Sequence, residues 1–337
     1  ICERVGPRLE CESGETWEPK ALKNAIFSFE GVNNSKGLAF VVTPDDPWFE
    51  PLKSEPDSLL RPYVTGDDIT SHALNRIERW ALDIADRGLD EIERRWPVAY
   101  RFLTEVVQPT RTPDALKSYK GLYDRWWQFW NHRADLMRRL RQRERFIAYS
   151  KVTKHPICML APTDWIYTNK VLLIGAERED LFAICISSFF RSWLEAYSGG
   201  NLGETLTLSI SESVAKFPLP LASVSQAGID AAARFNDISV VWSADRGCGL
   251  TEVMNAIHSP DTNDERIVEL RSLLETIDAE IAAAYGWHGL DLEHGFRQIQ
   301  GATNNDRWRH AVRSEEHTSE LQSLTNLVCR LLLEKKN

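Results

Sequence analysis

The chain has 337 residues, of which 43% are hydrophobic and 26% are charged, so one or two folded domains are expected. Its formal net charge of −9 argues against a protein that coats nucleic acids without specificity, because such proteins carry an excess of Lys and Arg. The longest apolar run, residues 181–190, is too short and too rich in serine to cross a bilayer, so no membrane partner is expected.

The six cysteines are scattered along the chain and form no C-x-x-C pair. This pattern argues against a zinc ribbon and against a disulfide framework, and it favours a reducing compartment, the cytoplasm. No secretory signal opens the chain. Because the first residue is Ile1, we expect the sequence to begin inside a longer reading frame.

The end of the sequence has a different character. Residues 313–323 read RSEEHTSELQS and residues 328–336 read VCRLLLEKK, which resembles the in-frame translation of a sequencing-adapter oligonucleotide. We therefore expect residues 313–337 to be a non-native, adapter-derived tail that contributes nothing to fold or function. The alternative is a genuine amphipathic terminal helix.

The first third of the chain predicts short strands followed by a helix. Up to about residue 42, short apolar runs alternate with Gly and Asn, which is typical of strands joined by turns. Residues 59–69 predict an extended segment with a turn at Gly66, and residues 78–86 predict another short strand. Residues 89–107 have a helical pattern.

A basic and aromatic segment follows. Residues 119–145 place Tyr123, Trp126, Trp127 and Trp130 before a run of arginines, with apolar and basic positions at helical spacing. From residue 111 to residue 154 the chain has twelve Lys or Arg and four Asp or Glu, a local charge of +8. This segment is a candidate phosphate-facing stripe, and the alternative is an ordinary solvated helix face.

The second half predicts strands and then helices. Residues 146–175 contain three β-rich runs that predict a small meander, residues 181–197 predict a helix, and residues 204–209 alternate as a short strand. Beyond the prolines near residue 220 the pattern is helical, and a well-capped helix is expected from Asp264. Its apolar stripe consists of Ile267, Leu270, Leu273, Leu274, Ile277 and Ile281.

These patterns predict an α/β (α+β) domain of mixed short strands and helices at residues 21–220, followed by an α-helical C-terminal region at residues 221–312. No catalytic, cofactor-binding or metal-binding constellation is predicted, because the chain has no glycine-rich phosphate loop, zinc-ligand set, H-E-x-x-H helix or nucleophile elbow. The dispersed histidines are expected to be surface or hydrogen-bonded residues rather than ligands. They are His72, His132, His155, His258, His288 and His294.

A series of motifs resembles the MmeI-like family (type IIL), large bacterial restriction-modification enzymes that join an endonuclease, an adenine-specific DNA methyltransferase and one target-recognition domain. The similar blocks occur in the family's order over roughly residues 20–300. They are RPYVTGDDI (61–69), VVQPTR (106–111), YDRWWQFWNHRADLMRRL (123–140), RFIAYSKVTKH (145–155), SSFFRSWLEAYSGGN (187–201), VAKFPLP (214–220), GLTEVMNAIHSP (249–260), IVELRSLLETIDAEIAAAYGW (267–287) and DLEHGF (291–296).

The resemblance implies that residues 21–220 are a target-recognition domain for double-stranded DNA, and that residues 1–20 are a remnant of an upstream methyltransferase domain or a linker. The parent protein would methylate adenine N6 after flipping the base out of the duplex. The cofactor S-adenosylmethionine would bind the missing upstream domain of the same chain. No cofactor is expected in this fragment, which lacks the N-P-P-[FY] loop of such enzymes.

The resemblance also implies base-reading residues on the strand that contains Glu204, Thr205 and Thr207. Alternate strand residues face the same way, Thr can contact base edges or a thymine methyl, and Glu can accept from cytosine N4. Many relatives have an R-x-R-Y arrangement at this strand, so the resemblance implies no recognition sequence. The alternative is ordinary strand polarity on a solvated face.

Phosphate contacts are predicted for basic residues that would fix the register of the duplex without reading its sequence. These candidates are Arg138, Arg139, Arg141, Lys151 and Lys154. Some of them are expected to form ion pairs on the surface instead.

Three alternatives to a restriction-modification parent remain open. The first is a methyltransferase of a phage-defence system without a nuclease, and the second is a stand-alone DNA-binding specificity subunit. The third is a helical-bundle interaction protein whose basic stripe is only a solvated face.

Overall fold

The computed structural model describes most of the chain around two hydrophobic cores. The described residues are 26–34, 38–73, 76–175, 178–202, 205–220, 222–287, 292–298 and 308–312. The expected remnant at residues 1–20 and the expected tail at residues 313–337 lie outside them. The fold is α+β with a helical C-terminal region, as the sequence predicts.

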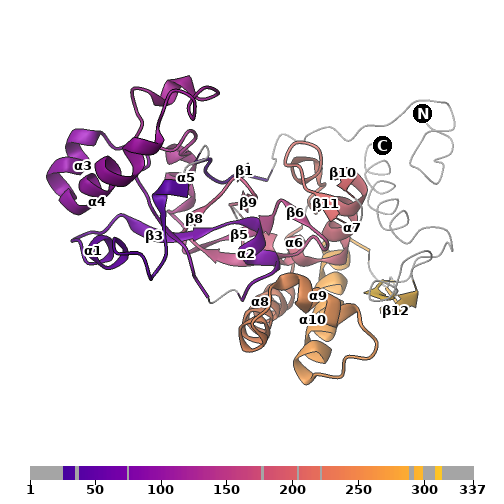
Figure 1. Ribbon diagram of the computed structural model, residues 1–337. Coiled ribbons are helices and arrows are strands. Elements are labelled where there is room, and N and C mark those ends of the chain that lie inside the picture. Colours follow the sequence, from indigo (N-terminus) through magenta and orange to yellow (C-terminus); the bar gives the residue numbers. More distant parts are fainter. Residues whose placement is uncertain are drawn as a thin grey trace, which may run out of the picture.

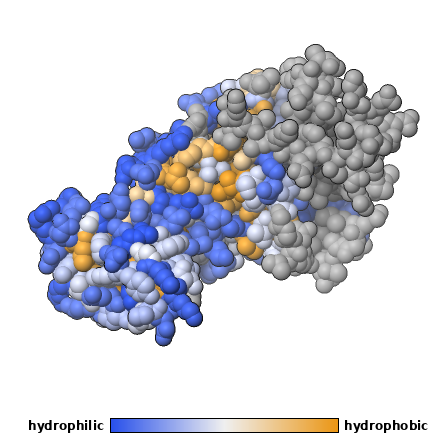
Figure 2. All heavy atoms as spheres, turned by 90° about the horizontal axis from the view of Figure 1, so that it is seen from above, coloured by the Kyte–Doolittle hydropathy of each residue, from blue (hydrophilic) through white to orange (hydrophobic). Residues whose placement is uncertain are grey.

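The smaller core lies in the lobe that carries α3 and α4 (Figure 1). Its sheet has the order β2-β4-β3-β8, with β2 (Val41–Val42), β3 (Leu60–Val64), β4 (Trp80–Leu82) and β8 (Ile166–Tyr167). The last strand comes from much later in the chain and pairs in parallel with β3. Figure 2 shows that mainly hydrophilic side chains cover this lobe, whereas hydrophobic side chains gather towards the middle of the molecule.

The helices of this lobe are short. They are α1 (Phe49–Lys53), α3 (Leu89–Arg95), α4 (Pro97–Phe102), the π turn η2 (Leu103–Val107) and the 3-10 turns η1 (Leu38–Phe40), η3 (Gln108–Thr110) and η4 (Lys120–Leu122). The carboxylate of Glu55, which is buried, accepts hydrogen bonds from the backbone N–H groups of Val98 (2.7 Å) and Ala99 (3.2 Å). It therefore supplies acceptors for N–H groups that the first turn of α4 leaves without a helical partner.

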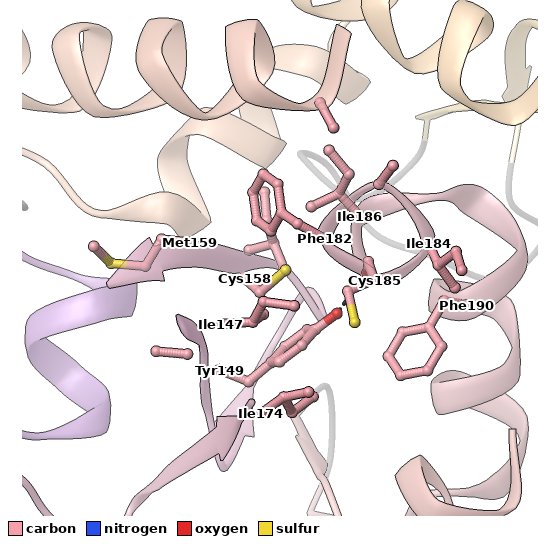
Figure 3. Close-up of a cluster of buried hydrophobic side chains, with 14 of the residues drawn as sticks. Ile147, Tyr149, Cys158, Met159, Ile174, Phe182, Ile184, Cys185, Ile186 and Phe190 are labelled. Carbon is pink, nitrogen blue, oxygen red and sulfur yellow. Dashed lines mark hydrogen bonds between the residues drawn. The ribbon is translucent and has the colours of Figure 1, made fainter. Parts of the chain in front are cut away.

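The larger core surrounds an antiparallel sheet of order β1-β9-β5-β7. The strands are β1 (Ser28–Glu30), β5 (Arg145–Ser150), β7 (Cys158–Pro162) and β9 (Val171–Ile174). The predicted meander is therefore wrong in its order, because β5 is central and lies between β9 and β7. In Figure 3 the Tyr149 hydroxyl reaches from β5 to the backbone carbonyl of Cys185, a hydrogen bond of 2.5 Å inside the core.

Helices α6 (Leu181–Ile186) and α7 (Ser188–Tyr197) pack against this sheet. The sequence predicts one helix over this range, but the chain is extended at Ser187, whose side chain accepts a hydrogen bond from the N–H of Phe190 (3.2 Å) and caps α7. The C-terminal helices α8 (Gln226–Arg246), α9 (Leu250–His258) and α10 (Glu265–Ala284) join the same core (Figure 1).

Helix α10 confirms the predicted cap and stripe. Asp264 accepts a hydrogen bond from the N–H of Arg266 (3.0 Å), and the predicted apolar positions are buried except Leu273, which is half-buried. The C-terminal region also contains an antiparallel hairpin, β12 (Gly295–Gln298) and β13 (Trp308–Ala311), that the sequence does not predict.

Two other predictions need correction. The turn at Gly66 is the start of a short helix, α2 (Gly66–Thr70), because Thr65 and Asp68 form a capping box. The predicted amphipathic helix over residues 119–145 is mostly absent, and only α5 (Ala134–Leu140) is α-helical there. The aromatic part reaches the smaller core from irregular turns, held by hydrogen bonds such as Trp127 Nε1 to the carbonyl of Arg87 (2.9 Å).

Candidate nucleic-acid interface

A three-stranded antiparallel sheet carries the predicted base-reading residues. Its order is β10-β11-β6, with β10 (Gly199–Leu202), β11 (Thr205–Thr207) and β6 (Val152–Thr153). Leu206, in the middle of β11, packs against the larger core, and its partner Thr153 on β6 is buried. Since neighbouring strand residues point to opposite faces, Thr205 and Thr207 project from the other face, where both are half-buried. Glu204 lies outside the described residues.

Strand β6 adds a residue to this face that the sequence analysis did not predict. Val152 lies directly opposite Thr207 and is 41% exposed. Side chains that are directly opposite in an antiparallel pair lie on the same face and in contact range. We call Val152, Thr205 and Thr207 the β6–β11 face. Alternation along β6 predicts that Val152 points away from the core. Only the pairing of β6 with β11 shows that it shares a face with Thr205 and Thr207.

Two residues that are predicted to contact phosphates lie on either side of β6. Lys154 directly follows the strand and is half-buried. Lys151 directly precedes it, accepts a backbone hydrogen bond from Leu208 just after β11 (2.8 Å), and forms an ion pair with Glu30 on β1 (2.5 Å). The structure thus brings these two lysines close to the β6–β11 face.

The three predicted arginines lie elsewhere, on and just after α5. This helix precedes β5 in the chain and β6 follows it, so the six residues of β5, about 20 Å of extended chain, separate the two groups. Arg138 forms ion pairs with Asp135 (2.6 Å) and Asp86 (3.1 Å). The basic segment is therefore two clusters of charge at opposite ends of one strand.

The other two arginines are also engaged within the chain. Arg141 pairs with Asp83 (2.7 Å) and donates to the carbonyl of Thr163 (3.1 Å), and the Arg139 guanidinium lies 3.9 Å from the ring centre of Phe27. The hydrogen bond from Arg138 to Asp135, and then the charge of Asp86, raise the pKa of Arg138 above its ordinary value. A duplex would have to compete with these acidic neighbours for the same guanidinium groups.

A second polar constellation was missed by the sequence analysis. His155, His258, His294 and His310 come together in the larger core, and we call them, with Arg191 and Arg309, the His–Arg cluster. The rings of His155 and His258 are 5.3 Å apart, and those of His294 and His310 are 6.3 Å apart. Three of these histidines lie in blocks that resemble the MmeI-like family, which is the signal that could have grouped them.

Burial controls the charge of these imidazoles. Desolvation, assisted by the charge of Arg309, lowers the pKa of His155 to about 3. Desolvation also lowers the pKa of His310 to about 4, and it lowers the pKa of His258 well below its ordinary value, with Arg191 and Arg309 adding to the effect. The three imidazoles are therefore neutral at pH 7. Among the described residues no group of three or more His, Cys, Asp or Glu side chains is arranged to hold a metal ion.

Comparison with known proteins relates the fold to solved structures. No protein family model matches the sequence, and no curated protein matches it. A solved structure does match: the type IIL restriction-modification enzyme MmeI in complex with DNA, with a TM-score of 0.60 and 17% sequence identity. This chain has the fold of part of MmeI. The match covers 86% of this chain and 37% of the MmeI chain.

At 17% identity the likeness to MmeI shows a shared fold. It agrees with the α+β architecture and the helical C-terminal region described above. The chain spans little more than a third of the MmeI chain. Among the described helices none is long and apolar enough to cross a membrane.

Proposed function

We propose that this chain is the DNA-recognition part of a site-specific, adenine-N6 DNA methyltransferase of the restriction-modification type. The observation that carries the proposal is the fold shared with MmeI over 86% of the chain. The order of the family-like sequence blocks supports it independently, because these blocks are features of the sequence and not of the fold. Methyl transfer and S-adenosylmethionine binding then belong to a domain upstream of Ile1.

The chemistry of the β6–β11 face suits base reading. Thr205 and Thr207 offer hydroxyl groups that donate or accept, and their methyl groups, like the Val152 side chain, can contact the thymine 5-methyl group. The major groove, which is about 12 Å wide, admits a two-stranded β-ribbon, and β6 and β11 form such a pair. We assign direct readout to this face.

Phosphate neutralisation complements that readout. Lys154 and Lys151 lie beside the face, where they can contact the backbone on either side of the groove and fix the register of the duplex. Arg138, Arg139 and Arg141 lie about 20 Å away along β5, which corresponds to a little over half a helical turn of B-DNA. In this arrangement they contact the backbone at a second, more distant position.

Binding selection with the full chain tests the proposal. Wild-type protein is expected to enrich one sequence family from a random duplex library, and to bind it with an affinity that falls steeply with salt. Replacing Thr205 and Thr207 together by Ala should relax the selected sequence at one or two positions and lower affinity about 10-fold or more. The matched control is Thr276→Ala on the exposed side of α10, which should leave both properties unchanged.

A variant that removes one positive charge distinguishes contacts with the DNA backbone from base reading. Lys154→Gln should weaken binding to all duplexes about equally and reduce the slope of log affinity against log salt by about 1. Absence of salt-dependent duplex binding by the folded wild-type chain would contradict the proposal and favour a protein-interaction module.

The enzymatic part of the proposal needs the parent protein. Recovery of the upstream reading frame is expected to reveal an N-P-P-[FY] loop and a glycine-rich cofactor motif, and the intact protein should transfer a methyl group to the selected duplex. A start codon shortly before Ile1, without either motif, would contradict the methyltransferase assignment and leave a stand-alone specificity subunit.

A further inference from the structure

Hydrogen-bond directions fix the protons of the His–Arg cluster. Arg309 Nη1 contacts Nδ1 of His155 (2.9 Å), and because a guanidinium can only donate, this nitrogen of His155 is the acceptor. The proton of neutral His155 is then on Nε2, which donates to Oδ1 of Asn255 (3.0 Å). Every polar atom of the His155 ring therefore has a partner.

The same reasoning leaves His258 with an unused donor. The backbone N–H of His310 donates to Nδ1 of His258 (3.1 Å), so the proton of the neutral ring is on Nε2. That Nε2–H group is buried and has no hydrogen-bond partner among the described residues; the His258 residue as a whole is 3% exposed. A buried donor without an acceptor costs roughly as much as a lost hydrogen bond.

Arg191, on α7, also has fewer hydrogen-bond acceptors than its guanidinium can use. The residue is 8% exposed, and within the described part of the chain its guanidinium makes one hydrogen bond, from Nη2 to the hydroxyl of Ser188 (3.2 Å), and no ion pair. Burial lowers the pKa of Arg191, as expected for a cation with too little compensation. Arg309 likewise forms no ion pair with an acidic side chain of the described residues.

The acidic groups around the cluster do not supply the missing acceptors. The buried carboxylate of Asp278 already accepts from the N–H of Ser188 (2.8 Å) and from His294 Nε2 (2.9 Å). Glu275 lies 3.5 Å from His310 Nε2 and its side chain is 46% exposed, and Glu195 interacts with Arg191 only as a nearby charge. Two guanidinium groups and one imidazole N–H therefore converge where acceptors are scarce.

We infer that Arg191, Arg309 and Nε2 of His258 form a binding site for a phosphate-class oxyanion. A tetrahedral oxyanion offers several strong acceptor atoms and a negative charge, which is what two guanidinium groups and an N–H donor require. A metal ion is a poor alternative, because the arginines would repel it. The inference goes beyond DNA recognition and does not depend on it.

Occupation of this site would tie distant segments together. Arg191 is on α7, His258 ends α9, and Arg309 is on the β12–β13 hairpin, where it also holds His155 after β6. An anion shared by these groups stabilises the folded chain, because the unfolded chain has no such site. It would also support the segment that leads into the β6–β11 face.

Titration of the full chain with inorganic phosphate tests the inference, with chloride at matched ionic strength as the reference. Phosphate is expected to broaden and shift its own phosphorus NMR signal in a saturable way. At about 10 mM it should raise the Tm by about 2–4 °C over the chloride reference. General salting-out also raises Tm, but it does not saturate at low millimolar concentration.

Single substitutions distinguish phosphate binding at this site from a general effect of salt. Arg191→Gln should weaken phosphate binding at least about 10-fold, the loss expected when one charge-assisted contact is removed. Arg309→Gln should do the same with less risk to folding, because this residue is half-buried. Arg234→Gln, which removes an exposed ion pair with Glu269 on α8 and α10, is the matched control and should leave phosphate binding unchanged.

The source of the phosphate is decided by adding duplex DNA. Release of bound phosphate by the duplex would identify a backbone phosphate as the occupant, whereas retention would identify a free anion. A phosphate effect of equal size in wild type, Arg191→Gln and Arg309→Gln, with no NMR change, would overturn the inference.

Discussion

Two regions of the larger core bury an arginine to the same extent and treat it in opposite ways. Arg271, 8% exposed, donates to the carbonyls of Ala256, Ile257, Ser259 and Thr262 at the C-terminal end of α9. Arg191, also 8% exposed, donates only to Ser188 among the described residues. Burial alone therefore does not separate a structural cation from a binding one, whereas the supply of hydrogen-bond acceptors does.

The smaller core follows the structural pattern. Glu55 is 7% exposed, but its two oxygens accept from two N–H groups at the start of α4. Its charge is therefore matched by the helix end that it caps. Of these three buried charged groups, Arg191 is the one with too few hydrogen-bond acceptors among the described residues.

Removal of Arg271 should have the largest effect on stability. Arg271→Met leaves the carbonyls at the end of α9 without donors and should lower the free energy of unfolding by about 3 kcal/mol. Urea unfolding in phosphate-free buffer measures the change. Arg191→Met is the matched comparison and should cost less than about 1 kcal/mol, because little bonding is lost. Equal losses for the two variants would contradict the distinction.

Acid should weaken the His–Arg cluster next. The pKa of His155 in the folded chain, about 3, lies below its unfolded value near 6.5, so its neutral form is part of the native state. Stability is then fully present above about pH 6.5 and is lost as the pH falls towards 3. Between pH 7 and pH 5 this histidine accounts for a loss of about 2 kcal/mol.

His155→Gln tests this assignment, since Gln can accept from Arg309 and donate to Asn255 without titrating. Unfolding free energies at pH 7 and pH 5 should differ less in this variant than in wild type. His72→Gln, at an exposed position just after α2, should keep the wild-type difference. An unchanged pH dependence in His155→Gln would assign the acid sensitivity to other groups.

The cap in the smaller core should have a more moderate effect. Glu55→Ala leaves the N–H groups of Val98 and Ala99 without acceptors and should lower the free energy of unfolding by about 1 kcal/mol. Glu50→Ala, on the exposed side of α1, provides the comparison and should change stability less. If the two variants behave alike, water replaces the Glu55 carboxylate without loss.

Local sequence signals predicted the elements whose stability is local. Asp264 and the stripe from Ile267 onwards define α10 within one segment, because the cap and the 3.6-residue period are both written there. The prediction over residues 119–145 was wrong because the side chains of Trp127 and Gln128 donate hydrogen bonds to the backbone carbonyl of Arg87, about 40 residues earlier. No local sequence pattern encodes that contact.

The candidate sites also contain residues that a local pattern groups together and residues that only the fold brings together. Alternation along β11 predicts that Thr205 and Thr207 share a face, and the structure has them on one strand with Leu206 turned to the core. Val152 joins that face only through pairing across some 55 residues, and the His–Arg cluster joins residues as far apart as His155 and Arg309. Such sites need the fold before they can be identified.

The smallest effect is expected at α5, where basic residues already have partners. Arg138 is exposed and shares its charge with Asp135 and Asp86, and such surface pairs contribute little because water screens them. Arg138→Gln should therefore leave the midpoint of urea unfolding without a resolvable change. For duplex binding it should reduce affinity less than Lys154→Gln does, since Lys154 lies next to the β6–β11 face and Arg138 lies about 20 Å away along β5. Fluorescence anisotropy on the selected duplex, at two salt concentrations, measures both variants. If Arg138→Gln weakens binding more than Lys154→Gln, the main phosphate contact lies at the α5 end of β5, and the assignment of readout to the β6–β11 face has to be revised with it.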